Sequence, residues 1–218
     1  MRELIERYVR ELVKIPSTSN TETEKSCADY IAEELAKQPY FKEYPEQTGK
    51  YLLPEDSFGR SVPWGLVKGR NGSRKTIILT GHYDVVDTEE YGNERALAYD
   101  VEKWENLVKS GNALPGMPEE VKEDFLSGEW MFGRGTADMK GGLSVGLALL
   151  DWYGKLVVEA ERKDCGTAAF ETKTASGTEE TPEISGNLLF VTVPDEEGYS
   201  AGMRHAVPFL NDLNWLIV

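Results

Sequence analysis

Cysteine, histidine, basic residues and long apolar runs are all scarce in this sequence. Its 218 residues include two cysteines, Cys27 and Cys165, which form no CxxC pair and so predict neither a disulfide framework nor a thiolate zinc site. No stretch approaches the roughly 18 apolar residues that a membrane helix needs. Residues 1–15 interleave charged with apolar side chains, unlike a secretory leader. We therefore expect a cytoplasmic protein.

Positive charge is also limited, since 38 acidic residues outnumber 24 basic ones and give a net charge of -14. Phosphate groups are bound by basic surfaces, so we expect neither nucleic acid nor an anionic membrane as a partner. Most of the acids are expected on a solvated surface. The hydrophobic fraction of 40% is that of a globular protein, and the length suffices for the core of one domain.

Apolar periodicity predicts two helices near the beginning of the chain. Apolar residues at positions 4, 5, 8, 9, 12 and 13 form one stripe of a helix that ends before Pro16. A polar connector over residues 15–20 precedes a second helix, where Thr21 and Glu24 have the spacing of a capping box. We interpret both helices as covers of the core without a chemical role.

The remaining pattern predicts an α/β fold with three layers, in which a central, mostly parallel sheet lies between helices. We expect strands at 62–69, 75–80 and 188–193, and the Asn-Gly pair between the first two predicts a hairpin. Residues 39–61 indicate loop and edge structure. Further helices are expected at 101–108, 118–126, after the glycines near 142, and at 200–213.

Two segments fit this pattern poorly. Residues 87–129 are charged and irregular, and such an excursion either covers an active site or is a variable surface insertion. Residues 163–186 are rich in Thr, Glu, Ser and Gly and poor in large apolar groups, so they predict a flexible insertion.

The densest cluster of glycines surrounds a single acid. Residues 133–142 read GRGTADMKGG, with Asp138 inside the cluster and an apolar helical run directly after it. Glycine permits positive φ and close backbone approach, so the pattern predicts a carboxylate in a tight loop before a helix. Two zinc ions about 3.5–4 Å apart need a carboxylate between them, and Asp138 is the candidate bridge.

A second candidate ligand lies where the predicted strand 75–80 ends. His82 and Asp84 are two residues apart and share a face of an extended chain. His82 could bind zinc while Asp84 orients its ring by accepting a hydrogen bond. The alternative is a surface or capped histidine.

A pair of acids follows the third predicted strand. Glu196 and Glu197 are adjacent, and one could bind metal while the other takes a proton from water. Taken alone, such a pair is more typical of a solvated turn.

An unrelated enzyme class is also open, because Gly142-Leu-Ser144-Val-Gly matches a serine nucleophile elbow. The strand that such an elbow requires before the serine is missing from the pattern.

Together the three ordered motifs resemble the co-catalytic zinc peptidase and deacylase family, which contains acetylornithine deacetylase, succinyl-diaminopimelate desuccinylase, aminoacylase and glutamate carboxypeptidases. The acidic segment after the histidine and the sequence VPDEEG resemble an arginine-utilisation branch of it. The resemblance implies a zinc-peptidase-like catalytic domain that binds two zinc ions, with cobalt or manganese as alternatives. Its expected partners are small N-acyl amino acids or short peptides.

The resemblance also implies a role for each candidate residue. It makes His82 a ligand of one zinc, Asp84 its orienting partner, Asp138 the bridge, Glu196 the general base and Glu197 a ligand of the second zinc. The family has a further acidic ligand, a last histidine and an inserted dimerisation domain that this sequence does not match. We therefore expect the first part of a catalytic domain, and a truncated, catalytically incompetent homologue with partial metal binding is the alternative.

Overall fold

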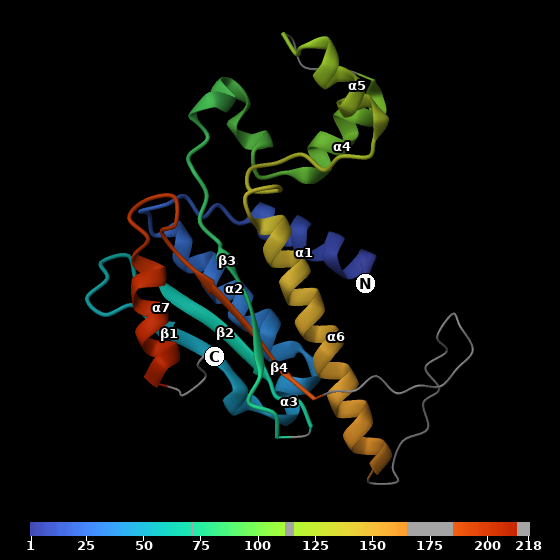
Figure 1. Cartoon of the computed structure of the whole chain (residues 1–218). Helices are drawn as coiled ribbons and strands as arrows, with labels where there is room; N and C mark the ends of the chain where they lie inside the picture. Colours follow the sequence, from blue (N-terminus) through green and yellow to red (C-terminus); the bar gives the residue numbers. More distant parts are fainter. Residues whose placement is uncertain (71, 112–115, 165–184, 213–218) are drawn as a thin grey trace.

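Four strands form one sheet in the order β1-β2-β4-β3 (Figure 1). The structure is a computed structural model that describes residues 1–70, 72–111, 116–164 and 185–212. The strands are β1 (Thr48–Leu52), β2 (Ser61–Val67), β3 (Thr76–His82) and β4 (Asn187–Val193). Strand β2 is antiparallel to both of its neighbours, and β3 is parallel to β4. Three strands therefore run in one direction, although two of the three pairings are antiparallel, and the expected α/β class is confirmed with a mixed sheet.

The predicted hairpin between the first two predicted strands, which are β2 and β3, is wrong. Strands β2 and β3 do not pair, because β4 lies between them and pairs with both. The Asn-Gly pair is a short-range signal, whereas the strand that pairs with β2 on this side comes from a segment more than a hundred residues later. Residues 39–61 contain the expected edge structure, strand β1, and in addition two short helices that were not expected, α3 (Pro39–Glu43) and η1 (Pro45–Gln47).

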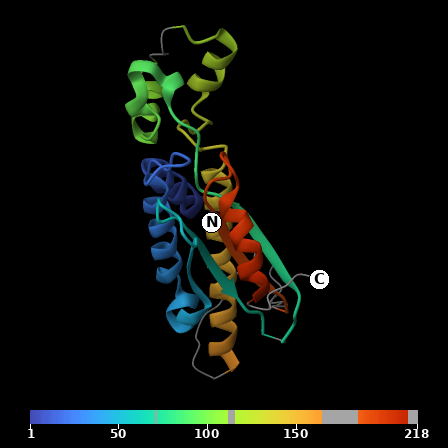
Figure 2. The same cartoon turned by 90° about the vertical axis from the view of Figure 1, so that its left-hand side faces the viewer.

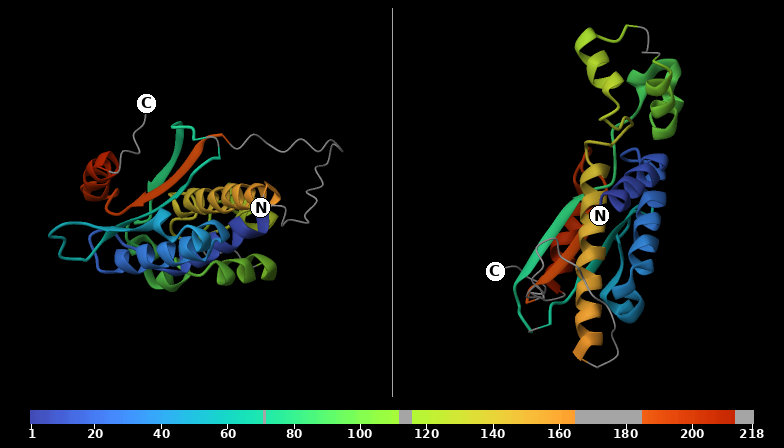
Figure 3. Two further views of the ribbon diagram at one scale, coloured as in Figure 1. Left: turned by 90° about the horizontal axis from the view of Figure 1, so that it is seen from below. Right: turned by 90° about the vertical axis from the view of Figure 1, so that its right-hand side faces the viewer.

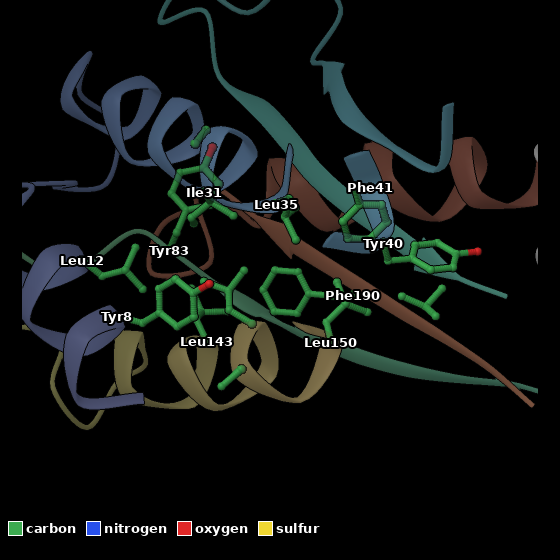
Figure 4. Packing of buried hydrophobic residues seen from close by; sticks show 14 of the residues in the cluster. Tyr8, Leu12, Ile31, Leu35, Tyr40, Phe41, Tyr83, Leu143, Leu150 and Phe190 are labelled. Atoms are coloured by element: carbon green, nitrogen blue, oxygen red, sulfur yellow. The ribbon is translucent and has the colours of Figure 1, made fainter. Parts of the chain in front are cut away.

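Helices cover both faces of the sheet, as predicted for three layers. One face carries α1 (Arg2–Lys14), α2 (Thr23–Lys37), α3 and α6 (Lys140–Asp164), while α7 (Ala201–Asp212) covers the other (Figures 1, 2 and 3). Strand β4 alternates between these layers. Phe190 packs with the first group, beside Leu143 and Leu150 of α6 (Figure 4), and Leu189 and Val191 pack beneath α7.

The charged segment after β3 forms a small helical unit of its own. It contains η2 (Glu89–Leu97), α4 (Val101–Ser110) and α5 (Glu119–Ser127), and projects beyond the end of β3 (Figure 1). A cluster around Trp104 and Phe125 stabilises it, and an ion pair between Arg10 and Glu105 joins it to α1.

The expected flexible insertion at 163–186 lies almost entirely outside the described residues. None of the described helices has the length and apolar character needed to span a membrane.

Strand β3 is one of the two edges of the described sheet and carries an exposed isoleucine, Ile77, which is 67% accessible. Exposed apolar edge strands favour pairing between molecules, and a lysine on the edge opposes it. We expect Ile77→Lys to reduce concentration-dependent self-association, measured by light scattering, and to change the free energy of unfolding by only about 0.5 kcal/mol. Thr80→Lys, on the same strand, separates the effect of charge from that of lost apolar surface. Unchanged association in Ile77→Lys would contradict this role for Ile77.

Candidate metal centre

The parallel pairing of β3 and β4 brings two of the sequence motifs to one place. In this register His82 lies opposite Val193, so the histidine and the turn after β4 share one end of the sheet. The His82 side chain is almost fully buried. Its Nδ1 lies 2.9 Å from the main-chain oxygen of Asp84 and 3.5 Å from that residue's Oδ1. Its Nε2 faces Asp138 Oδ1 at 3.0 Å and Glu196 Oε2 at 3.7 Å.

Asp84 is completely buried and accepts hydrogen bonds from several sides. Its Oδ2 accepts from Ser19 Oγ at 2.6 Å and from the Glu197 main-chain N–H at 3.1 Å, and its Oδ1 accepts from the Glu196 N–H at 3.0 Å. Burial acts to raise the pKa of Asp84, but hydrogen bonds from His82, Ser19 and these two N–H groups hold it below its ordinary value. Asp84 therefore connects the histidine to the turn that carries both glutamates.

Asp138 is held at the start of α6 by the glycine-rich loop. Gly135 has a φ of +82°, and a Cβ there would lie 2.8 Å from Val85 Cγ1, so only glycine fits without displacement. The buried Lys140 donates from Nζ to the main-chain oxygen of Ile15 at 2.7 Å and ties the loop to the connector after α1. The Asp138 side chain itself is 77% accessible and faces His82. The prediction of an acid in a tight loop before a helix is thus confirmed.

Glu196 and Glu197 are exposed and lie at the mouth of this site. One ligand atom from each of His82, Glu196 and Glu197 lies within 4.8 Å of the others. Partial burial raises the pKa of Glu197, and Asp138, Glu196 and Asp84 raise it further while His82 lowers it. Burial opposes protonation of His82, but Asp84 and Asp138 outweigh it and raise its pKa to about 9. Four side chains of the predicted site are therefore close together: His82 Nε2 faces Asp138 and Glu196, and Glu197 lies in the same cluster.

This donor set fits a divalent metal ion. Imidazole nitrogen and carboxylate oxygen are ligands for zinc, cobalt and manganese alike. The accumulation of negative charge around the His82 ring would be offset by a cation. The contacts of Asp84 with the ring resemble the carboxylate contacts that orient metal-binding histidines.

The serine nucleophile elbow is contradicted by the structure. Ser144 lies inside α6, is fully buried, and donates from Oγ to the Lys140 main-chain oxygen at 2.7 Å. The element directly before α6 is the helix α5, whereas a nucleophile elbow requires a strand there. His205, the remaining histidine, lies in α7 and belongs to no described cluster of three metal-competent side chains.

Sequence reasoning missed the residues beneath the turn. Glu24 was expected to act as part of a capping box, but α2 begins at Thr23 and the Glu24 side chain is fully buried instead. Its Oε1 accepts from the Asn20 N–H at 2.8 Å and its Oε2 from the Asp195 N–H at 2.9 Å. Burial, with the charge of Asp84, raises the pKa of Glu24 to about 7. The only available signal was an acid within an otherwise helical apolar face, which by itself indicates a cap.

The layered α/β fold, with the acidic cluster at the carboxyl ends of β3 and β4, has counterparts among solved structures. The fold is similar to that of human carnosine dipeptidase 1, with a TM-score of 0.57 and 15% identity over 97% of this chain and 36% of that one. It is also similar to the M20 family metallo-carboxypeptidase Sso-CP2 from Sulfolobus solfataricus, with a TM-score of 0.52 and 17% identity over 96% and 35% of the two chains.

In sequence, the chain is a relative of two proteins of Bacillus subtilis strain 168. It is 31% identical to Protein RocB over 211 residues, which are 97% of this chain and 32% of RocB. It is 36% identical to the uncharacterized protein YqjN over 203 residues, 93% of this chain and 31% of YqjN. No protein-family model matches the chain. The similarity in sequence to RocB confirms the resemblance expected from the three motifs. The chain spans about a third of the length of these two relatives.

Proposed function

We propose that this chain is part of the catalytic domain of a metal-dependent hydrolase that cleaves amide bonds in small N-acyl amino acids or short peptides. The observation that carries the proposal is the convergence of His82 with Asp138, Glu196 and Glu197 at the ends of two parallel strands. Similarity in sequence to RocB and in fold to an M20 metallo-carboxypeptidase supports the same reaction class. In this proposal, residues 163–186 are an insertion into the domain. A role in arginine utilisation and a cytoplasmic location stay predictions.

The residues divide the work of such a reaction between them. A bound divalent ion, expected as a zinc pair, would supply a Lewis acid that polarises the amide carbonyl and lowers the pKa of water. His82, Asp138 and Glu197 would hold the metal, and Asp84 fixes the orientation of the His82 ring. Glu196 keeps an exposed carboxylate at the mouth of the site, where it can accept a proton from water and return it to the leaving amine.

The metal content of the chain tests the proposal most directly. We expect the chain to retain zinc after dialysis, measured by elemental analysis, and Asp138→Ala to lose most of it, because the loop then offers no carboxylate beside His82. Asp124→Ala, which removes an exposed aspartate from α5, is the matched control and should retain the wild-type content. Equal zinc in the wild type and Asp138→Ala, or none in the wild type, would contradict the proposed centre.

A second candidate function is partial metal binding without catalysis. The observation that favours it is that the chain covers only about a third of RocB. Zinc binding together with no hydrolysis of N-acyl amino acids or dipeptides would support this alternative. Hydrolysis that is abolished by a chelator and restored by zinc would exclude it.

A further inference from the structure

Three consecutive main-chain N–H groups of the turn after β4 all donate to buried carboxylates. Asp195 donates to Glu24 Oε2 at 2.9 Å, while Glu196 and Glu197 donate to the two oxygens of Asp84 at 3.0 and 3.1 Å. Asp84 belongs to the site already described. Glu24 does not, since it comes from the first turn of α2 and its side chain contacts no candidate ligand.

Glu24 is itself held in place by a buried arginine. Arg60 Nη1 lies 3.3 Å from Glu24 Oε1 and 3.4 Å from Asp195 Oδ1, and Arg60 is only 7% accessible. Asp56 fixes the other side of the guanidinium, accepting from Nε at 2.9 Å and from Nη2 at 2.7 Å. The start of α2 and the start of β2 thus meet beneath the turn, joined by a network of ionic hydrogen bonds.

The turn has little freedom to move away from this network. Asp195 has a φ of +64°, and its side chain accepts from the Ala201 N–H at 3.0 Å. A Cβ on Gly198 would lie 2.4 Å from Asp195 Oδ1 and 2.6 Å from Asn20 Nδ2, so the turn packs directly against the connector before α2. Loss of the Glu24 carboxylate would leave the buried Asp195 N–H without its acceptor, and such a group is costly to bury. The turn would then shift, and both glutamates would shift with it.

We propose that Glu24 and Arg60 are positioning residues that hold the turn of residues 194–198 so that Glu196 and Glu197 face His82. They act through the Asp195 main chain and side chain. The inference rests on the proposed metal centre, because the positions of the two glutamates matter for function only if they meet a metal ion there.

The test measures cobalt binding by visible absorption, on the 218-residue chain, at a temperature where circular dichroism shows each variant to be folded. We expect Glu24→Ala to weaken Co²⁺ binding by about 10–100-fold, as found for residues that orient metal ligands, and to alter the absorption bands. Glu24→Gln should have a smaller effect, because its amide oxygen can still accept one of the two N–H groups. Arg60→Lys should also weaken binding, because an ammonium cannot reproduce the forked contacts.

Glu34→Ala is the matched control. Glu34 is a nearly buried acid of the same helix, paired with Arg7 and Lys37 and without contact to the turn. The Glu34→Ala variant should lower the stability of the fold, as Glu24→Ala does. It should still bind Co²⁺ within about twofold of wild type, because Glu34 does not hold the turn. If Glu24 acted on stability alone, Glu24→Ala and Glu34→Ala would have the same affinity for Co²⁺.

The possible results separate the two proposals. Wild-type affinity and unchanged bands in Glu24→Ala would overturn the positioning role and leave the metal centre intact. Absence of Co²⁺ binding in both the wild type and Glu34→Ala would overturn the centre and the positioning role together. Should Glu24→Ala fail to fold, Glu24→Gln and Arg60→Lys decide, and wild-type binding by both would overturn the positioning role.

Discussion

Replacing Glu196 by glutamine is expected to lower the turnover of N-acyl amino acids by about 10²–10⁴-fold while the metal content stays unchanged. Glutamine has nearly the same shape but cannot accept a proton at neutral pH. The Glu196 carboxylate is exposed at the mouth of the site, and its main-chain N–H is already fixed by Asp84. The substitution should therefore remove proton transfer without moving the turn. The measurement combines steady-state kinetics, in a form of the protein that shows hydrolysis, with elemental analysis of zinc.

Glu197→Gln is the matched comparison, since it changes the neighbouring residue in the same way. We expect it to lose bound zinc, and to lose activity for that reason. Both glutamates belong to the cluster around His82, with Glu196 Oε2 only 3.7 Å from Nε2, so distance alone does not separate their roles. Retention of zinc by Glu197→Gln and loss by Glu196→Gln would show that the two roles are exchanged. Undiminished turnover in Glu196→Gln would show that Glu196 is not the group that accepts the proton.

The sequence predicted the parts of the site that depend on short-range pattern. A β-branched run followed by His82 and Asp84, and an apolar run followed by the glutamate pair, placed both motifs at strand ends. Because parallel strands end on the same edge of a sheet, their meeting followed from the fold class. The structure confirms that meeting through the register of β3 with β4.

What the sequence could not predict depends on contacts between distant segments. The strand between β2 and β3 is β4, and the Asn-Gly pair in the sequence contains no information about it. Glu24 has the spacing of a cap, and only the folded chain shows that its carboxylate reaches the Asp195 N–H, 171 residues away in sequence. Ser19 likewise lies in a plain polar connector, yet it donates to the buried Asp84. Polar residues that support a site from a distant segment thus have the local sequence pattern of caps or connectors.

Asp84→Ala is expected to weaken zinc binding by about 10–100-fold and to destabilise the fold by about 3–5 kcal/mol. The carboxylate is completely buried and accepts from Ser19 and from two main-chain N–H groups of the turn, besides facing the His82 ring. Its removal leaves these buried donors without an acceptor, and each such loss is unfavourable. His82 Nδ1 also loses its carboxylate contact and keeps only the main-chain oxygen of residue 84. The measurements are zinc titration and chemical denaturation of the metal-free chain.

Asp151→Asn provides the matched control for this effect. Asp151 is a nearly buried aspartate of α6 whose carboxylate pairs with Lys155, one helical turn further along. Asp151→Asn should lower the stability of the fold without changing the zinc affinity. Asp84→Asn should lower both the stability and the zinc affinity, because the amide nitrogen of the new asparagine would face a main-chain N–H donor. Equal zinc affinity in Asp84→Asn and wild type would mean that the main-chain oxygen of residue 84 alone orients the ring. In that case the conformation of the backbone after β3, rather than the buried carboxylate, would set the geometry of the histidine.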